Sequence, residues 1–212
     1  MPEDHLLEGL RRFKEDYFPR YEEEYRKLVE DGQHPKTLFI GCSDSRVLPN
    51  LLLGSSPGEV FIVRNVGNIV PPFAPELGYH GTCASIEFAV LSLNVNDIVV
   101  CGHSHCGAIR ALYNPPLAGS THLAKWLELA QDATLPVTQS EEALRRTEQR
   151  SIILQLERLM GYPMVRERVE QGRLFLHGWH YTIEEGDVSV LDVPSGRFVP
   201  AGSTGQPGGM KI

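Results

Sequence analysis

Cys42, His103 and Cys106 are the residues whose types and positions point most directly to chemistry. Two thiolates and one imidazole form a ligand set that suits zinc. Three protein ligands leave the fourth tetrahedral position open, which is typical of a catalytic rather than a structural zinc site. The sequence therefore predicts a catalytic zinc ion held by these three side chains.

Asp44 and Arg46 lie just after Cys42 in the segment CSDSR. A carboxylate so near the metal can ligate it or accept a hydrogen bond from a zinc-bound hydroxide. The guanidinium group of Arg46 can hold that carboxylate by a two-pronged pair and keep it ionised. Because two thiolates cancel the formal charge of the ion, we expect a less acidic water than on a three-histidine zinc, and activity that rises toward alkaline pH.

Three other interpretations of these residues stay open at this point. The segment 102–107 is similar to a nucleophile elbow, but Cys106 occupies the place of that motif's second glycine. A nucleophilic pair of Cys106 and His103 leaves Cys42 and its neighbours without a role. The third interpretation is that the cysteines and histidine are only buried core residues, as a single cysteine usually is.

Three short apolar segments must position the two clusters, and each is typical of a β-strand. TLFIG (37–41) runs into the Cys42 cluster, EVFIVRN (59–65) follows it, and DIVVCGH (97–103) runs into the turn that holds Cys106. Helical patterns separate the last two strands and follow the third. Strands that alternate with helices predict an α/β fold with a mostly parallel sheet flanked by helices. Since ligands gather at the carboxyl ends of such strands, both clusters should lie at one end of one sheet.

Residues 1–32 read as a charged, amphipathic helical arm. Pro19 predicts a break in it, and a second helix should end at Gly32. The arm packs either on a partner subunit or on its own core. The apolar residues at helical spacing in its first part are Leu6, Leu7, Leu10, Phe13 and Tyr17.

The second half of the chain predicts helices at 121–133 and 140–163, the latter capped by Ser140. Residues 173–193 read as a C-terminal β-hairpin at a sheet edge, with a Glu-Gly-Asp turn. Residues 201–212 contain too much glycine to fold. We therefore expect one domain over 1–200, with the arm at 1–32, an α/β core at 33–200 and a flexible tail at 201–212.

Composition narrows the class of protein. The chain has 212 residues and a formal net charge of -7, which argues against nucleic-acid binding. No apolar run approaches the roughly 20 residues of a membrane span, and the start does not resemble a secretory signal. The even number of cysteines would allow two disulfides, but a cytoplasmic, reducing location favours a metal. Cys83 and Cys101 then read as core residues.

C-x-D-x-R followed by G-H-x-x-C-G resembles the zinc signature of the β-class carbonic anhydrases. The resemblance continues through GEVFIVRNVGNIVPPF, ASIEFAVLSLNV and LHGWHY and covers about residues 4–200. TLFIGCSDSRV, VRNVGNIVPPF and DIVVCGHSHCGAIRAL are most similar to cyanobacterial, carboxysome-associated members. The resemblance implies reversible hydration of CO2 to bicarbonate and a proton. It also implies one zinc ion per subunit on Cys42, His103 and Cys106, with Asp44 and Arg46 as the catalytic dyad.

Within the family, the chain resembles the plant-type, constitutively open subgroup. That subgroup implies that Asp44 hydrogen-bonds to zinc-bound water and does not ligate zinc. Phe88 departs from the pattern, because it stands where the subgroup carries a tyrosine, so one pocket hydrogen bond is in doubt. The substrate-binding residues that the resemblance implies are Gln33, Phe61, Val66, Phe88 and Gly107.

A pH-gated bacterial subgroup binds inhibitory bicarbonate through a tryptophan, an arginine and a tyrosine. This chain matches that set at Arg64 and Tyr181 but has Phe39 in place of the tryptophan. The missing indole N–H weakens such a site, so we do not expect bicarbonate inhibition.

The resemblance also implies partners and a location. Family members are dimers or multiples of dimers, with the N-terminal helices embracing the neighbour, and the amphipathic arm is consistent with a homodimer. The location would be cytoplasmic, with the carboxysome and its proteins as a further expectation. Two alternative functions remain: hydrolysis of CS2 or COS on the same fold, or a catalytically silent carboxysome scaffold component.

Overall fold

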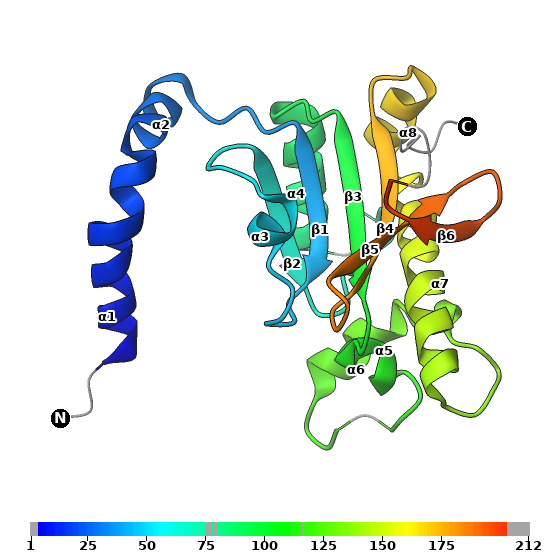
Figure 1. Ribbon diagram of the computed structural model, residues 1–212. Coiled ribbons are helices and arrows are strands. Elements are labelled where there is room, and N and C mark those ends of the chain that lie inside the picture. Colours follow the sequence, from blue (N-terminus) through cyan, green and yellow to red (C-terminus); the bar gives the residue numbers. More distant parts are fainter. Residues whose placement is uncertain (1–3, 75–77, 79, 116, 203–212) are drawn as a thin grey trace.

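The computed structural model describes residues 4–74, 78, 80–115 and 117–202. Its centre is a six-stranded sheet in the order β2-β1-β3-β4-β5-β6 (Figure 1). The first four strands in this order run parallel, and β5 and β6 are antiparallel to their neighbours. The predicted α/β fold with a mostly parallel sheet is confirmed. The strands are β1 (Thr37–Cys42), β2 (Val60–Asn65), β3 (Asp97–His103), β4 (Phe175–Thr182), β5 (Asp187–Asp192) and β6 (Arg197–Pro200).

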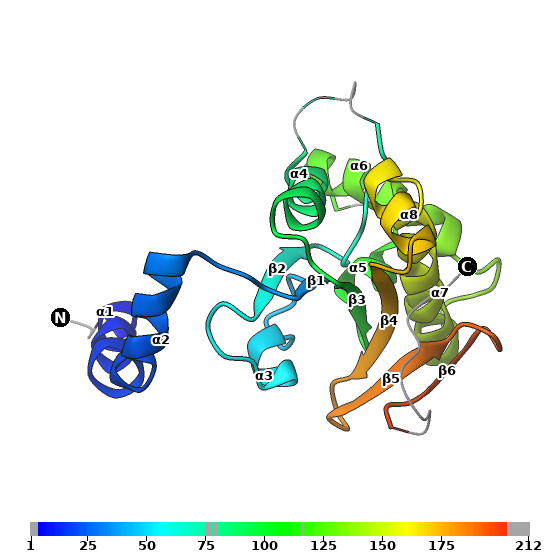
Figure 2. The same cartoon turned by 90° about the horizontal axis from the view of Figure 1, so that it is seen from above.

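Helices cover the sheet unequally on its two faces. Figure 2 shows α4, α7 and α8 on one face and the short α3 on the other. The helices of the core are α3 (Pro49–Leu53), α4 (Gly81–Glu87), α5 (Gly107–Ala111), α6 (Thr121–Glu128), α7 (Glu141–Leu159) and α8 (Pro163–Glu170). A π-helical turn, η3 (Phe88–Ser92), continues α4, and a 3-10 turn, η4 (Gln131–Ala133), follows α6.

The central strands are buried because they are apolar on both faces. β1 and β3 read TLFIGC and DIVVCGH, and all but the first residue of each is buried. Continuous apolar runs of this kind are typical of parallel strands covered on both sides. The main core lies between the sheet and α4, α7 and α8, and a smaller cluster lies on the opposite face around Phe39, Val99 and Cys101.

The N-terminal arm stands apart from the body (Figures 1 and 2). It consists of α1 (His5–Arg12), a π-helical turn η1 (Phe13–Tyr17) and α2 (Phe18–Asp31), which follow one another without interruption. The predicted break at Pro19 is therefore wrong. Pro19 lies in the first turn of α2, where a helix does not use the missing N–H, and the wider π-helical turn comes just before it.

The arm exposes apolar side chains along most of its length. Its residues are not buried, and near its end Leu28 packs against Gly58 of the body. An apolar surface of this kind is unusual for a monomer. The large apolar side chains that it exposes are Leu6, Leu7, Leu10, Phe13, Tyr17, Tyr21, Tyr25 and Val29.

Other elements agree with the sequence in part. The Ser140 side chain accepts a hydrogen bond from the Ala143 amide at the start of α7, as predicted. The hairpin of β4 and β5 forms, but it does not lie at the edge, because β6 adds a further strand beyond it. The helices α3 and α8 were not predicted; each begins at a proline in its first turn. Residues 203–212 of the expected tail lie outside the described part of the chain.

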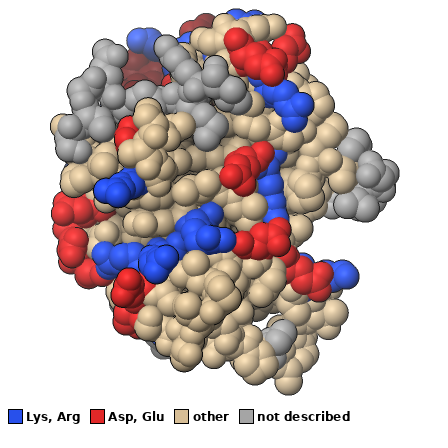
Figure 3. Space-filling model, turned by 90° about the vertical axis from the view of Figure 1, so that its right-hand side faces the viewer, with Lys and Arg blue, Asp and Glu red and all other residues tan. Residues whose placement is uncertain are grey.

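The surface carries charges of both signs. On the face that Figure 3 presents, a short band of Lys and Arg side chains crosses the middle and is bordered by Asp and Glu. Among the residues that the structure describes, each helix is too short or too polar to cross a membrane.

Candidate metal centre

Cys42, His103 and Cys106 come together at the carboxyl ends of two neighbouring strands. Cys42 ends β1, His103 ends β3, and Cys106 lies in the turn after β3. The Sγ and ring nitrogen atoms that they offer all lie within 4.8 Å of one another, and all three residues are buried. The geometry thus agrees with the site expected from the sequence, since parallel neighbours deliver their following turns to the same sheet end.

The backbone holds the Cys42 sulfur. The amides of Asp44 and Gly67 each donate to Cys42 Sγ over 3.4 Å. Gly67 has φ +81°, and a Cβ placed there would lie 2.9 Å from Cβ of Ala108. A glycine is required at this position, because both the backbone angle and the close approach exclude a side chain.

Cys106 is fixed by the helix that it precedes and by α7. The amides of Ile109 and Ala108 face its sulfur, and its own amide donates to Glu148 Oε1 over 3.2 Å. A hydrogen bond between the two thiols lowers the pKa of Cys42 and raises that of Cys106 well above its usual range. Two cysteine sulfurs that interact this closely suit a bound cation, which stabilises thiolates.

His103 is oriented as a ligand. Its Nδ1 lies 2.9 Å from the carbonyl oxygen of Ser104, which fixes the proton on that nitrogen. Its Nε2 is buried and has no hydrogen-bond partner in the described part of the chain. A buried nitrogen without a partner is costly unless something else satisfies it. A buried imidazole nitrogen in this state, beside two cysteine sulfurs, fits a zinc ion.

Asp44 and Arg46 form a two-pronged pair beside these ligands. Nε and Nη2 of Arg46 donate to the two carboxylate oxygens of Asp44 over 2.9 and 2.7 Å. These bonds hold the pKa of Asp44 well below its usual range, so the carboxyl group stays ionised. Oδ2 of Asp44 lies 3.9 Å from Nε2 of His103, which places an anionic acceptor beside the nitrogen that would bind the metal.

Two further contacts keep this pair in place. Nη2 of Arg46 also donates to the carbonyl oxygen of His105, over 3.2 Å. His105 adopts φ +57°, which turns its backbone at that point, and its ring lies 3.3 Å from Glu184. Arg64 donates to the carbonyl oxygens of Cys42 and Asp44 over 2.9 and 2.7 Å and so fastens the turn after β1.

The expected substrate-binding residues divide into two groups. Val66 and Gly107 adjoin residues of the metal centre, next to Gly67 and Cys106. Phe61 is four residues before the end of β2, so it lies about 13 Å back along the sheet from the Cys42 level. Its ring packs against Phe88, with 5.8 Å between centroids, and Phe88 is 45% exposed.

Within one chain, the side chains of Gln33, Phe39 and Tyr181 do not join the metal centre, and Arg64 touches it only through the backbone carbonyl groups of Cys42 and Asp44. Gln33 is exposed in the segment between α2 and β1. Phe39 is fully buried and packs edge-on against Trp179, in the cluster that also includes Tyr181. The guanidinium group of Arg64 is engaged by backbone carbonyl groups, as described above.

Two residues that support the centre were not singled out from the sequence. Glu148 accepts from the Cys106 amide, and Trp126 donates from Nε1 to the carbonyl oxygen of Val66 over 2.7 Å. Glu148 could have been found, because it falls at spacing four between Leu144 and Ile152 on the apolar face of α7. An acid at such a position is buried and needs a partner. Trp126 carried no comparable signal.

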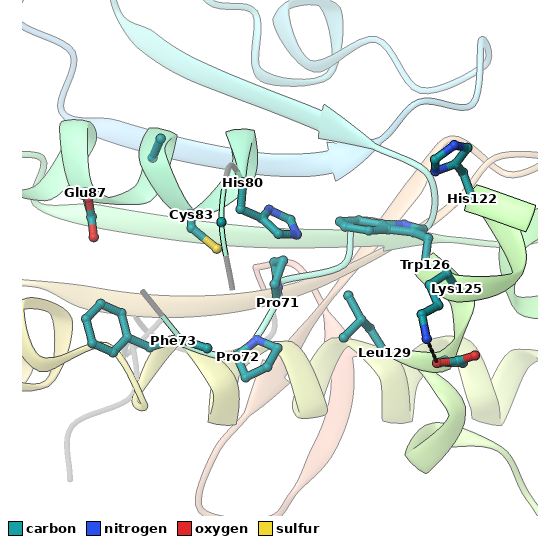
Figure 4. Close-up of a pocket in the computed structure, with 14 residues that line it drawn as sticks. Pro71, Pro72, Phe73, His80, Cys83, Glu87, His122, Lys125, Trp126 and Leu129 are labelled. Atoms are coloured by element: carbon teal, nitrogen blue, oxygen red, sulfur yellow. Dashed lines mark ion pairs between the residues drawn. The ribbon is translucent and has the colours of Figure 1, made fainter. Parts of the chain in front are cut away.

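A cavity of about 660 Å³ lies between α4, α6 and the segment 71–74. Figure 4 shows its walls, with the rings of His80 and Trp126 side by side and Pro71, Phe73 and Leu129 opposite. Those two rings stack with 5.6 Å between centroids. The three residues of the metal centre do not line it. The cavity is therefore separate from the place where chemistry would occur.

Comparison with known proteins agrees with the site. A family model described as carbonic anhydrase matches residues 37–188. A carbonic anhydrase of Pseudomonas aeruginosa is 44% identical over 203 residues, covering 92% of this chain and 90% of the relative. A carbonic anhydrase of Synechococcus elongatus is 40% identical over 191 residues, covering 86% of this chain and 69% of the relative.

Solved structures give the same result. The β-carbonic anhydrase CcaA has a TM-score of 0.89 at 37% identity, covering 97% of this chain and 93% of that chain. A tetrameric β-carbonic anhydrase of Sordaria macrospora has a TM-score of 0.70 at 32% identity, covering 89% and 93%. The span matched by the family model includes all three residues of the metal centre and the Asp44–Arg46 pair.

Proposed function

The chain belongs to the β-class carbonic anhydrases, and from that premise we propose that Cys42, His103 and Cys106 hold one zinc ion in each subunit. As a carbonic anhydrase, it catalyses the reversible hydration of CO2 to bicarbonate and a proton. The observation that carries the zinc assignment is the buried, unpartnered Nε2 of His103 beside two cysteine sulfurs. Sulfur and imidazole donors suit zinc better than they suit magnesium or calcium.

When bound, zinc would acidify water and so supply a hydroxide nucleophile near neutral pH. The chain's own residues then have distinct tasks. Asp44 is ionised and faces the metal position, so it can accept a hydrogen bond from the nucleophile and fix its direction. Arg46 uses two nitrogens on that carboxylate and holds both of its oxygens. Because Arg46 holds both carboxylate oxygens of Asp44, this arrangement supports Asp44 as a hydrogen-bond acceptor for the nucleophile and not as a metal ligand, as in the open, plant-type subgroup.

The substrate pocket is proposed to form at a subunit boundary. Val66 and Gly107 line it beside the metal, whereas Phe61 and Phe88 lie too far along the sheet to reach the metal of their own chain. Phe88 is exposed near the β2 edge, where a partner would cover it. We assign Phe61, Phe88 and the exposed Gln33 to the pocket of the partner subunit.

Bicarbonate inhibition is not part of the proposal. Phe39 is fully buried against Trp179 and offers no polar atom, and Arg64 is occupied by the turn after β1. These contacts support an enzyme that lacks a separate inhibitory bicarbonate site at these residues.

The oligomer is proposed to be a homodimer or a multiple of dimers, with the N-terminal arm on the neighbouring subunit. The exposed apolar side chains of the arm support this, as does the tetrameric state of the Sordaria macrospora structures. Association with a carboxysome rests on the sequence resemblance to cyanobacterial members and on the similarity to the Synechococcus elongatus relative.

The alternative functions are not favoured. The curated relatives reported above are named carbonic anhydrases, which supports CO2 over CS2 or COS as the substrate. The complete set of metal-centre residues and the intact Asp44–Arg46 pair argue against a catalytically silent scaffold. Assays of CO2, CS2 and COS on one preparation would separate these activities.

The first prediction tests the role of Asp44. Stopped-flow CO2 hydration should fall by about a hundredfold or more in Asp44→Asn, since an amide cannot accept in the same way, while the zinc content stays near that of the wild type. Asp97→Asn is the matched control, because Asp97 is also paired, with His177 at 2.7 Å, but lies at the opposite end of β3. Unchanged turnover in Asp44→Asn would contradict the assigned role, and a zinc-loaded wild type that does not hydrate CO2 would contradict the function.

A further inference from the structure

Glu148 and His180 form a buried polar pair behind the metal centre. Glu148 is 3% exposed in the middle of α7, and His180 is 1% exposed on β4. His180 Nε2 lies 3.0 Å from Glu148 Oε2. The other carboxylate oxygen, Oε1, accepts from the Cys106 amide over 3.2 Å. Both oxygens of one buried carboxylate are therefore in use.

The pair is not explained by stability alone. Removing an acid and an imidazole from water is costly, and buried pairs can often be replaced by apolar residues without loss of stability. The neighbouring positions of α7, Leu144 and Ile152, are apolar and pack in the core. An apolar residue at 148 would continue that face, so the carboxylate must serve something that an apolar side chain cannot.

The Glu148 carboxylate accepts the hydrogen bond of the Cys106 amide, which an apolar side chain could not do. Cys106 is the N-cap residue of α5 with an extended backbone, and its amide donates to Glu148 of α7. Without Glu148, that buried N–H would lose the acceptor it has in the structure, and the turn could rotate to find another. Such a rotation would move the sulfur away from Cys42 and His103.

His180 in turn fixes Glu148. Its ring is held edge-on by Phe198 of β6, with 6.4 Å between centroids, and its backbone pairs with Gly102 in β3 and Ser189 in β5. Hydrogen-bonded partners behind metal ligands commonly set the orientation of those ligands. Here the partner acts through the backbone of the ligand and not through its sulfur.

We propose that Glu148 is a positioning residue that sets the place of the Cys106 thiolate through its backbone amide, and that His180 orients Glu148 for this task. The inference rests on the proposed zinc site. It explains the buried pair by its effect on zinc affinity and on the position of the Cys106 thiolate, and not by its effect on the stability of the fold.

Three variants test the proposal. Glu148→Gln keeps an oxygen that can accept from Cys106. Glu148→Met combined with His180→Leu replaces the pair by apolar side chains of similar size. Thr147→Val is the matched control, since Thr147 is also fully buried on α7 and bonds Tyr113 without touching the metal centre.

Zinc affinity is measured by competition with a chromophoric chelator, and thiolate geometry by the charge-transfer absorption of the cobalt(II)-substituted protein. In the apolar double variant, zinc affinity should fall by about 10- to 100-fold and the cobalt band should change, while the melting temperature stays close to that of the wild type. Glu148→Gln should keep zinc affinity within about threefold of the wild type, and Thr147→Val should leave zinc affinity and the cobalt spectrum unchanged.

The outcomes distinguish a failure of the role of Glu148 from a failure of the zinc assignment. A folded double variant that binds zinc as tightly as the wild type overturns the role of Glu148, and an unfolded one overturns it too, because the pair would then be a requirement of the fold. A wild type that does not bind zinc tightly overturns the zinc assignment itself.

Discussion

At the scale of single residues, Tyr162 links the main core to the loop behind the metal centre. It is fully buried, its hydroxyl donates to the carbonyl oxygen of Pro71 over 2.9 Å, and it lies 3.1 Å from Cys83 Sγ. Burial raises the pKa of Tyr162 well above its usual range. The phenol therefore stays neutral in the folded protein under conditions that ionise an exposed tyrosine.

This pKa predicts how stability changes at alkaline pH. The unfolded chain releases the Tyr162 proton near pH 10, whereas the folded protein keeps it. Its contribution to the free energy of unfolding is therefore fully present below about pH 10 and falls by up to about 1.4 kcal/mol per pH unit above it. Urea unfolding between pH 9 and about pH 11.5 should give a shallower decline for Tyr162→Phe than for the wild type. Equal slopes would contradict the shift.

The grouping of Cys42, His103 and Cys106 was predictable from the sequence at the scale of residues, and the residues that support this group were not. These three residues carry a distinctive pattern, because Cys and His at the ends of two neighbouring parallel strands are residue types that can bind a metal together. Glu148 and Trp126 act through backbone groups of other residues, so their partners appear only once the chain is folded. The pairing of Phe61 with Phe88 likewise depends on how α4 and its π-helical turn cross β2.

At the scale of elements, the loop of residues 66–71 is fastened from several sides. Trp126 of α6 bonds the carbonyl oxygen of Val66, and Gln155 of α7 accepts from the Val70 amide over 2.9 Å. Arg158 donates to the carbonyl oxygen of Val70 over 3.2 Å. Helices α6 and α7 thus hold the loop whose Gly67 amide supports the Cys42 sulfur.

Gly67→Ala should disturb this loop and the centre together. The substitution adds the strain of a positive φ and a contact 2.9 Å from Ala108 Cβ. We expect a loss of about 2–4 kcal/mol in the free energy of unfolding and weaker zinc binding. Gly172→Ala is the matched control, with φ +65° and open space around the added Cβ, and should lose about 1 kcal/mol with zinc affinity unchanged. Denaturant unfolding and chelator competition measure both, and equal losses at the two glycines would refute the close contact.

Elements with a strong periodic pattern were predicted well, and those set by tertiary contacts were not. Strands β1, β2 and β3 lie within one residue of their predicted bounds, because continuous apolar runs leave few alternatives to a buried strand. β6 has only four residues and depends on pairing with β5. Pro19 was expected to end a helix, but the π-helical turn before it allowed the helix to continue.

At the scale of the whole molecule, the exposed apolar arm allows a test of the proposed dimer. A triple variant removes three apolar side chains of the arm, with the substitutions Leu6→Ser, Leu10→Ser and Tyr17→Ser. These side chains are 67%, 64% and 55% exposed in one chain. If they are buried on a neighbour, the dimer dissociation constant should rise by about a hundredfold or more. Sedimentation across a range of protein concentrations measures it.

A control on the same arm removes charge and leaves the apolar residues intact. Glu22→Ser with Arg26→Ser breaks an exposed pair with a 3.3 Å separation and should leave the dissociation constant nearly unchanged. An oligomer unaffected by the three apolar substitutions would show that the arm does not hold the subunits together.

In the proposed dimer, the folding of the arm would depend on the concentration of the protein. Its two helices have no buried residues within a single chain and touch the body only near Leu28 among the contacts described above, and a helix with so little tertiary packing is only marginally stable in water. Docking on a neighbour and forming the helix are then one equilibrium, whose position follows mass action. In the proposed dimer, dilution would therefore melt residues 5–31 while the sheet remains folded, and the secondary structure of the arm would be a property of the pair of chains.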